Sequence, residues 1–129
     1  MKNMKKLIAL ALVAISILTV TIQAFANPIT LYVAPGENPR TVGYEFDDDF
    51  ASFDCDCTLA GSGDTVRVFL DTFNIARNNW VLRKSHKFTS DGSITLTYNL
   101  GNTESKARIR TYGYKENSGT ATVVVTVNN

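Results

Sequence analysis

Hydrophobic and polar residues alternate with a period of two along most of the chain after residue 28. This period places successive side chains on opposite faces of a β-strand, and no segment shows the period of an amphipathic helix. The alternating segments are residues 29–33, 41–46, 53–59, 66–71, 80–88, 94–100, 106–112 and 121–127. Gly, Pro, Asn or Asp residues lie between them, so the pattern predicts about eight short strands joined by turns.

Each predicted strand has one apolar and one polar face, which is typical of antiparallel sheets covered on one side only. Parallel strands would need long crossover connections, and the chain offers no helical segment for them. We therefore expect an all-β fold: a single antiparallel β-sandwich of about seven or eight strands with an immunoglobulin-like Greek key, or alternatively a small jelly roll or barrel. The turn residues Asp91 and Gly92, with residues 117–119, further predict that the last four strands form consecutive hairpins.

Residues 1–26 have the features of a cleavable signal peptide of bacterial type. Three lysines in the first six residues precede an apolar run at residues 7–22, and Ala24 and Ala26 supply the small residues of a cleavage site before Asn27. The apolar run is shorter than the ~20 residues that a membrane-spanning helix needs. We expect residues 27–129 to form one secreted domain, extracellular or loosely associated with the envelope, with no stable membrane insertion after cleavage.

The charges of residues 27–129 are distributed unevenly. Residues 27–75 contain nine acidic and two basic residues, whereas residues 76–129 contain eight basic and three acidic residues. The two halves of a sandwich sequence need not become two halves in space, so the sequence alone predicts no dipole. It does define one acidic and one basic stretch in which to look for a binding site.

The basic stretch includes one strand with a row of charged and aromatic side chains. Arg108, Arg110 and Tyr112 share the outward face of that strand with Lys106, and Arg83 is a further candidate. Cations held at regular spacing suit a repeating anionic polymer, so we expect these residues to bind an extracellular or cell-wall polymer. Two other interpretations stay open: an ordinary solvated face, or ion pairs with the acidic strands of the same chain.

The acidic stretch suggests a calcium site as one interpretation. Asp47, Asp49, Asp54 and Asp56 are its candidate ligands, because calcium prefers clustered oxygen ligands. Their spacing is not that of an EF-hand loop, and the alternative is an acidic surface that stays hydrated. We expect no other cofactor.

Cys55 and Cys57 lie two residues apart, so a regular strand would point both side chains into the core. Buried thiols are one outcome. A Cys55–Cys57 disulfide is another, because an exported chain meets oxidants, although the strand would have to bend to form it. A metal, redox or intermolecular role is a third, and His86, the single histidine, is the one further histidine or cysteine that could join such a site.

The sequence contains no recognisable catalytic triad, phosphate-binding loop or zinc-protease motif. We therefore expect a non-catalytic binding or structural module that contacts an envelope polymer or another extracellular protein. The alternative is a small secreted antagonist, either a bacteriocin-like toxin or an enzyme inhibitor. Trp80 is expected in the core, with stacking on a glycan as the other possibility.

Overall fold

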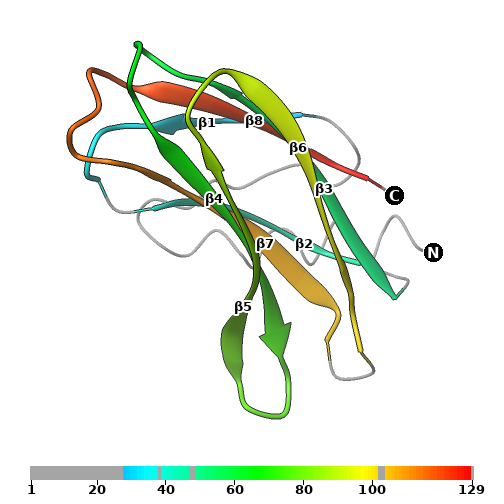
Figure 1. Cartoon of the computed structure of the whole chain (residues 1–129). Coiled ribbons are helices and arrows are strands. Elements are labelled where there is room, and N and C mark those ends of the chain that lie inside the picture. Colours follow the sequence, from blue (N-terminus) through cyan, green and yellow to red (C-terminus); the bar gives the residue numbers. More distant parts are fainter. Residues whose placement is uncertain (1–27, 38, 47–48, 102–103, 129) are drawn as a thin grey trace.

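The computed structural model consists of two four-stranded antiparallel sheets packed as a sandwich (Figure 1). It describes residues 28–37, 39–46, 49–101 and 104–128. The strands are β1 (Ile29–Val33), β2 (Arg40–Glu45), β3 (Phe50–Thr58), β4 (Val66–Asn74), β5 (Asn79–Phe88), β6 (Gly92–Asn99), β7 (Lys106–Gly113) and β8 (Ala121–Val127). The prediction of an all-β sandwich with about eight strands is confirmed. The predicted signal peptide lies outside the described residues.

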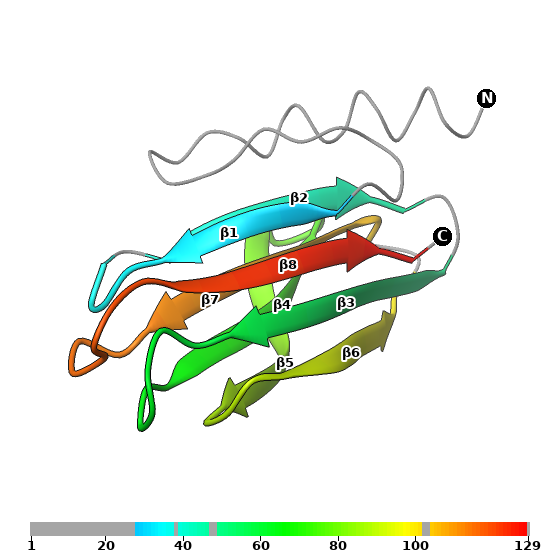
Figure 2. The ribbon, with the colours of Figure 1, turned by 90° about the horizontal axis from the view of Figure 1, so that it is seen from above.

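The order of the strands is that of a jelly roll. Sheet A has the order β2-β7-β4-β5 and sheet B the order β1-β8-β3-β6 (Figure 2). The pairs are nested, because β1 pairs with β8, β2 with β7, β3 with β6 and β4 with β5. An immunoglobulin-like domain instead keeps several consecutive strands side by side in one sheet. The jelly-roll alternative is therefore correct, and the immunoglobulin-like topology is wrong.

Consecutive hairpins among the last four strands are absent from the described part of the chain. Each connection from β5 to β8 carries the chain from one sheet to the other, and β4–β5 is the one consecutive pair that shares a sheet. The turn residues Asp91 and Gly92 do mark a chain reversal, at the start of β6. A turn sequence fixes where the chain reverses but not which sheet receives the next strand, which is why this prediction is wrong.

The core fills the space between the two sheets with the inward side chains of nearly every strand. Tyr44, Phe53 and Leu31 are its largest fully buried members, and Tyr44 and Phe53 both contact Phe46 edge-on, with ring centroids 4.9 and 5.5 Å apart respectively. Burying one such side chain stabilises a fold by about 1.5–3 kcal/mol. Their burial agrees with the apolar face that the period-two pattern predicts for each strand.

One irregularity interrupts the pairing of β4 with β5. The Cα partners are Leu70 with Lys84 and Asp71 with Leu82, so Arg83 is an extra residue opposite the junction of Leu70 and Asp71. Such a bulge reverses the facing of the residues on one side of it. It decides where the Arg83 side chain goes, as described below.

Candidate functional site: the basic–aromatic face of sheet A

The outer face of sheet A gathers cations and aromatic rings from three strands and from the residue that follows β7. In β4 the residues alternate with the buried Val66, Val68 and Leu70, and in β7 they alternate with the buried Ala107 and Ile109. We call this surface the basic–aromatic face. It consists of Arg67, Phe69 and Phe73 of β4, Trp80 and Lys87 of β5, Lys106, Arg108, Arg110 and Tyr112 of β7, and Tyr114.

Asp71 anchors the two central arginines of this face. The Nε atoms of Arg108 and Arg110 donate to Asp71 Oδ2 over 2.8 and 2.6 Å, and Arg110 Nη2 donates to Oδ1 over 3.1 Å. The Asp71 side chain is 2% exposed, whereas those of Arg108 and Arg110 are 24% and 27% exposed. One carboxylate therefore fixes two guanidinium groups that still reach solvent.

Aromatic rings support the cations from the neighbouring strands. The Cζ atom of Arg108 lies 4.2 Å from the centroid of the Trp80 ring, and that of Arg110 lies 4.5 Å from the centroid of the Phe69 ring. The Nζ atoms of two lysines lie over rings as well: Lys106 over Phe73 at 5.2 Å and Lys87 over Tyr114 at 5.7 Å. Such contacts hold cations in place without neutralising them.

The face keeps a positive charge after its internal pairing. Five cations lie on it (Arg67, Lys87, Lys106, Arg108 and Arg110), and register places two carboxylates, Asp71 and Glu45, on the same side. The interpretation that ion pairs within the chain neutralise this face is therefore correct in part, because the single charge of Asp71 balances one of the two arginines that it contacts. The other cations leave a surface that attracts anions.

Arg83 does not belong to this face, which corrects the prediction that grouped it with Arg108 and Arg110. Because of the bulge, its side chain turns to the inner side of sheet A, where Arg83 Nε donates to Thr72 Oγ1 over 3.0 Å. Arg83 Nη2 donates to Glu104 Oε2 over 2.7 Å, and its Cζ atom lies 4.8 Å from the centroid of the Tyr98 ring of sheet B. Arg83 thus joins the two sheets.

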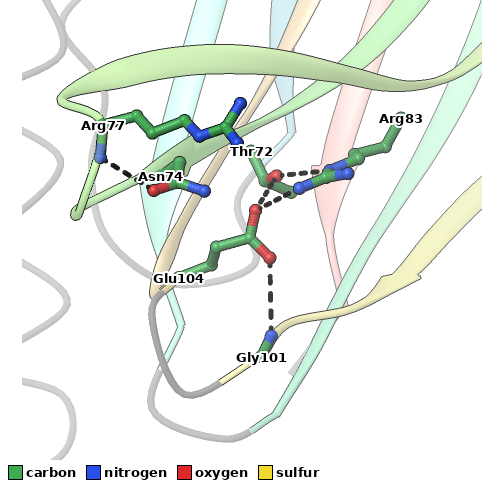
Figure 3. Close-up of polar contacts among 6 residues, drawn as sticks. All are labelled: Thr72, Asn74, Arg77, Arg83, Gly101 and Glu104. Atoms are coloured by element: carbon green, nitrogen blue, oxygen red, sulfur yellow. Dashed lines mark hydrogen bonds and ion pairs between the residues drawn. The ribbon is translucent and has the colours of Figure 1, made fainter.

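Glu104 is the centre of that inner cluster, as Figure 3 shows. It accepts the hydroxyl hydrogen of Thr72 over 2.6 Å and the backbone N–H of Gly101 over 3.5 Å, in addition to its bond with Arg83. Burial by itself raises the pKa of Glu104, but the hydrogen bonds from Thr72 and Arg83 outweigh it and hold the pKa below its usual value. The Glu104 carboxylate is therefore ionised, and at one end of the sandwich it links Thr72 and Arg83 of sheet A to Gly101, which follows β6.

The candidate calcium ligands are dispersed. Asp54 and Asp56 lie on the outer face of sheet B, where Asp54 Oδ1 accepts from Thr95 Oγ1 over 2.6 Å and Asp56 Oδ1 accepts from Ser93 Oγ over 3.0 Å. The hydrogen bond from Thr95 lowers the pKa of Asp54, with help from Asn128. Asp49 precedes β3 at the far end of the strand, and Asp47 lies outside the described residues. Within the described ranges, no three His, Cys, Asp or Glu side chains are grouped to hold a metal ion.

Cys55 and Cys57 are free thiols in the core, 0% and 1% exposed. The central strand β3 pairs regularly with β6 on one side and β8 on the other, so it does not bend as a bridge between residues two apart would require. Burial is the main cause that raises the pKa of Cys55 to about 12 and that of Cys57 to about 11, and the charges of Asp54 and Asp91 add to it. Of the three interpretations, the structure has buried thiols.

Both thiols are expected to resist alkylation in the folded protein at about pH 8 and to react after unfolding. Their pKa values lie well above that pH, so the reactive thiolate is scarce, and the core excludes the reagent. Iodoacetamide labelling with and without urea, followed by mass spectrometry, measures this. Rapid labelling of the folded protein, or an intact mass lower by two hydrogens, would contradict it.

The β7 half of the basic–aromatic face was predicted from the sequence, whereas the β4–β5 half was not. Lys106, Arg108, Arg110 and Tyr112 do share one face, as predicted. Trp80 lies at this face and is partly exposed, so its expected place in the core is wrong. The signal for Phe69 and Phe73 was present, because both alternate with core residues of the same strand.

Comparisons with known proteins identify a fold and no family. No protein-family model matches the chain, and no curated protein sequence matches it. PirA has a TM-score of 0.54 and 16% identity over 78% of this chain and 93% of its own. A non-crystalline cellulose specific carbohydrate-binding module, CBM28, has a TM-score of 0.55 and 10% identity over 79% of this chain and 73% of its own.

The third comparison involves a small part of a larger protein. The secreted serine protease VesC from Vibrio cholerae has a TM-score of 0.56 and 10% identity over 88% of this chain, which spans 23% of the VesC chain. At these identities the likeness shows the β-sandwich fold alone. Among the described residues, no helix has the length and hydropathy to cross a membrane.

Proposed function

We propose that this protein is an extracellular, non-catalytic module that binds an extended anionic polymer along the basic–aromatic face. The observation that carries the proposal is a group of five cations on an open sheet, four of them held over aromatic rings, against two carboxylates. Export is proposed from the signal peptide predicted at residues 1–26.

The geometry suits a repeating ligand better than a compact one. Side chains that follow one another on the same face of a strand are ~6.6–6.8 Å apart, and Arg108 and Arg110 are such neighbours. Asp71 and the rings of Trp80 and Phe69 already restrict both guanidinium groups. A polymer with regularly spaced anionic groups can therefore contact successive cations at a reduced entropic cost.

The fold is compatible with this role. One structural neighbour is a module specific for non-crystalline cellulose, so a polymer ligand has a precedent on a similar sandwich. Cellulose is uncharged, whereas the face described here is cationic. We therefore assign the ligand to the class of acidic polysaccharides and polyol phosphates of cell envelopes, and not to neutral glucans.

The test is retention of residues 27–129 on immobilised heparin and on wall teichoic acid at increasing salt. Replacing Lys87 and Lys106 together with Gln removes two cations that do not contact Asp71. We expect this to weaken binding about tenfold, equivalent to ~1.4 kcal/mol, and to reduce its dependence on salt.

A matched control pair removes the same charge elsewhere. Lys84 is exposed and lies opposite the inward Leu70, and Lys115 is exposed in the connection after β7. Replacing both with Gln should leave retention nearly unchanged. Salt-independent retention of the wild type, or equal weakening by the two pairs, would refute the proposal.

A further inference from the structure

The strand β6 forms a free edge of sheet B, which Figure 2 shows at the margin of that sheet. Within the described residues it pairs with β3 alone, in one unbroken register from Gly92 opposite Cys57 to Asn99 opposite Phe50. An edge strand directs the N–H and C=O groups of every second residue away from its single partner. β6 therefore offers a row of backbone donors and acceptors to another chain.

The other three edge strands carry features that discourage such pairing. β1 has five residues, β2 follows Pro39 directly, and β5 contains two lysines and the bulge at Arg83. Short strands, prolines, bulges and lysines are common means of protecting an edge. β6 has none of them, because residues 92–99 form a regular strand of eight residues without a charge or a proline. The unprotected edge is thus confined to one strand.

A hollow of about 320 Å³ lies beside the second half of β6 and is large enough for a side chain. Thr97, Tyr98 and Asn99 of β6 line it together with Phe50 of β3 and Lys84 of β5. Lys84 is exposed and Phe50 is 45% exposed, so the hollow combines an accessible cation with aromatic surface. When a strand is added to a sheet, backbone hydrogen bonds supply the affinity, and hollows beside the edge select its side chains.

The charges beside this edge favour an acidic partner. β5 contacts β6 from the other sheet, and it carries three cations and no acidic residue. A second copy of the chain fits poorly, because pairing β6 with β6 about a two-fold axis would bring the cationic β5 strands of both copies together. A strand with acidic side chains toward β5 would instead be attracted to Lys84.

We propose that the β6 edge binds an extended acidic segment of another protein as an added strand of sheet B. The side chains of that strand alternate between two sides. Those toward β5 are Asp or Glu, and one of them reaches Lys84 in the hollow. Those on the other side are neutral, because they continue the outer face of sheet B, which already carries Asp54 and Asp56. No residue that lines the hollow belongs to the basic–aromatic face, so this contact does not depend on polymer binding.

The probe is a nine-residue peptide of alternating Glu and Thr, added at saturation to residues 27–129, which contain both sheets. We expect amide hydrogen exchange to slow at least tenfold at every second residue of β6 and to stay unchanged in β1, the other edge of sheet B. A peptide of alternating Lys and Thr should have no effect. N-methylation of two consecutive residues near the centre of the acidic peptide should at least halve the number of protected β6 amides, because one of the two N–H groups must face β6.

Lys84→Glu tests the charge beside the hollow. It should weaken binding of the acidic peptide about tenfold in calorimetry, because attraction to the peptide becomes repulsion. The matched control is Lys115→Glu, which reverses the same charge in the connection after β7 and should change the affinity less than about twofold. Equal weakening by both substitutions, or slowed exchange confined to sheet A, would overturn the proposal. Protection of β6 that rises with protein concentration in the absence of peptide would overturn it in favour of a second copy.

Discussion

Replacing Arg108 and Arg110 together with Glu is expected to lower the free energy of unfolding by about 3–5 kcal/mol. Asp71, which is buried, depends on both guanidinium groups, and the double change would surround its carboxylate with two more negative charges. Urea denaturation followed by circular dichroism measures the loss. Since small domains have a stability of about 5–15 kcal/mol, this loss is a large share of the total.

Substitutions of these two arginines therefore affect stability as well as binding. A double charge reversal cannot serve as a probe of binding alone, because it removes the partners of a buried carboxylate. Replacing Lys84 and Lys115 with Glu is the control, since it reverses the same charge at two exposed positions and should cost less than ~1 kcal/mol. Equal stability of the two variants would show that Asp71 is solvated and that the described ion pairs are wrong.

Val125→Asp is expected to destabilise the fold by at least about 4 kcal/mol. Val125 is 2% exposed, and it lies between Ile29 of β1 and Cys55 of β3 in the centre of sheet B. A carboxylate at this position would have neither water nor a cation beside it. Thermal or urea unfolding of the purified variant checks this, and failure to express in soluble form agrees with it.

The matched substitution is Thr122→Asp on the same strand. Thr122 faces outward from sheet B and pairs with Tyr32 and Thr58, so a new charge there reaches solvent. Thr126 is a poorer control, because it lies directly opposite Asp54 and an aspartate there would add cross-strand repulsion. If Thr122→Asp costs as much as Val125→Asp, the facing of β8 described here is incorrect.

The strands could be predicted because burial imposes a local pattern. In β8 every second residue is buried: Ala121, Val123, Val125 and Val127. The residues between them are partly exposed, and this alternation can be seen directly in the sequence. The order of the strands could not be predicted in the same way. The turn residues that reverse the chain are alike whether the next strand joins the same sheet or crosses to the other one.

The candidate site, too, could be predicted where the pattern is local and could not where it depends on the topology. Lys106, Arg108 and Arg110 could be placed on one face because they are two residues apart within a regular strand. Arg83 could not, because a single extra residue in β5 turned its side chain to the inner side, and a bulge leaves little trace in the alternation of a strand as irregular as this one. The role of Asp71 as the shared partner depends on which strand lies beside β7, and so on the topology.

The nested pairing of the strands has a consequence for how the chain folds. β4 and β5 are the one pair in the described residues that are neighbours both in sequence and in a sheet, whereas β1 meets β8 from the opposite end of the chain. The entropy of closing those long loops must be met before the outer pairs form, so we expect folding to be slow and to begin locally at the β4–β5 hairpin. Sheet B cannot be completed until β8, the last strand, has been synthesised. A chain that ends before β8 leaves β1 without its partner and exposes the edge of β3.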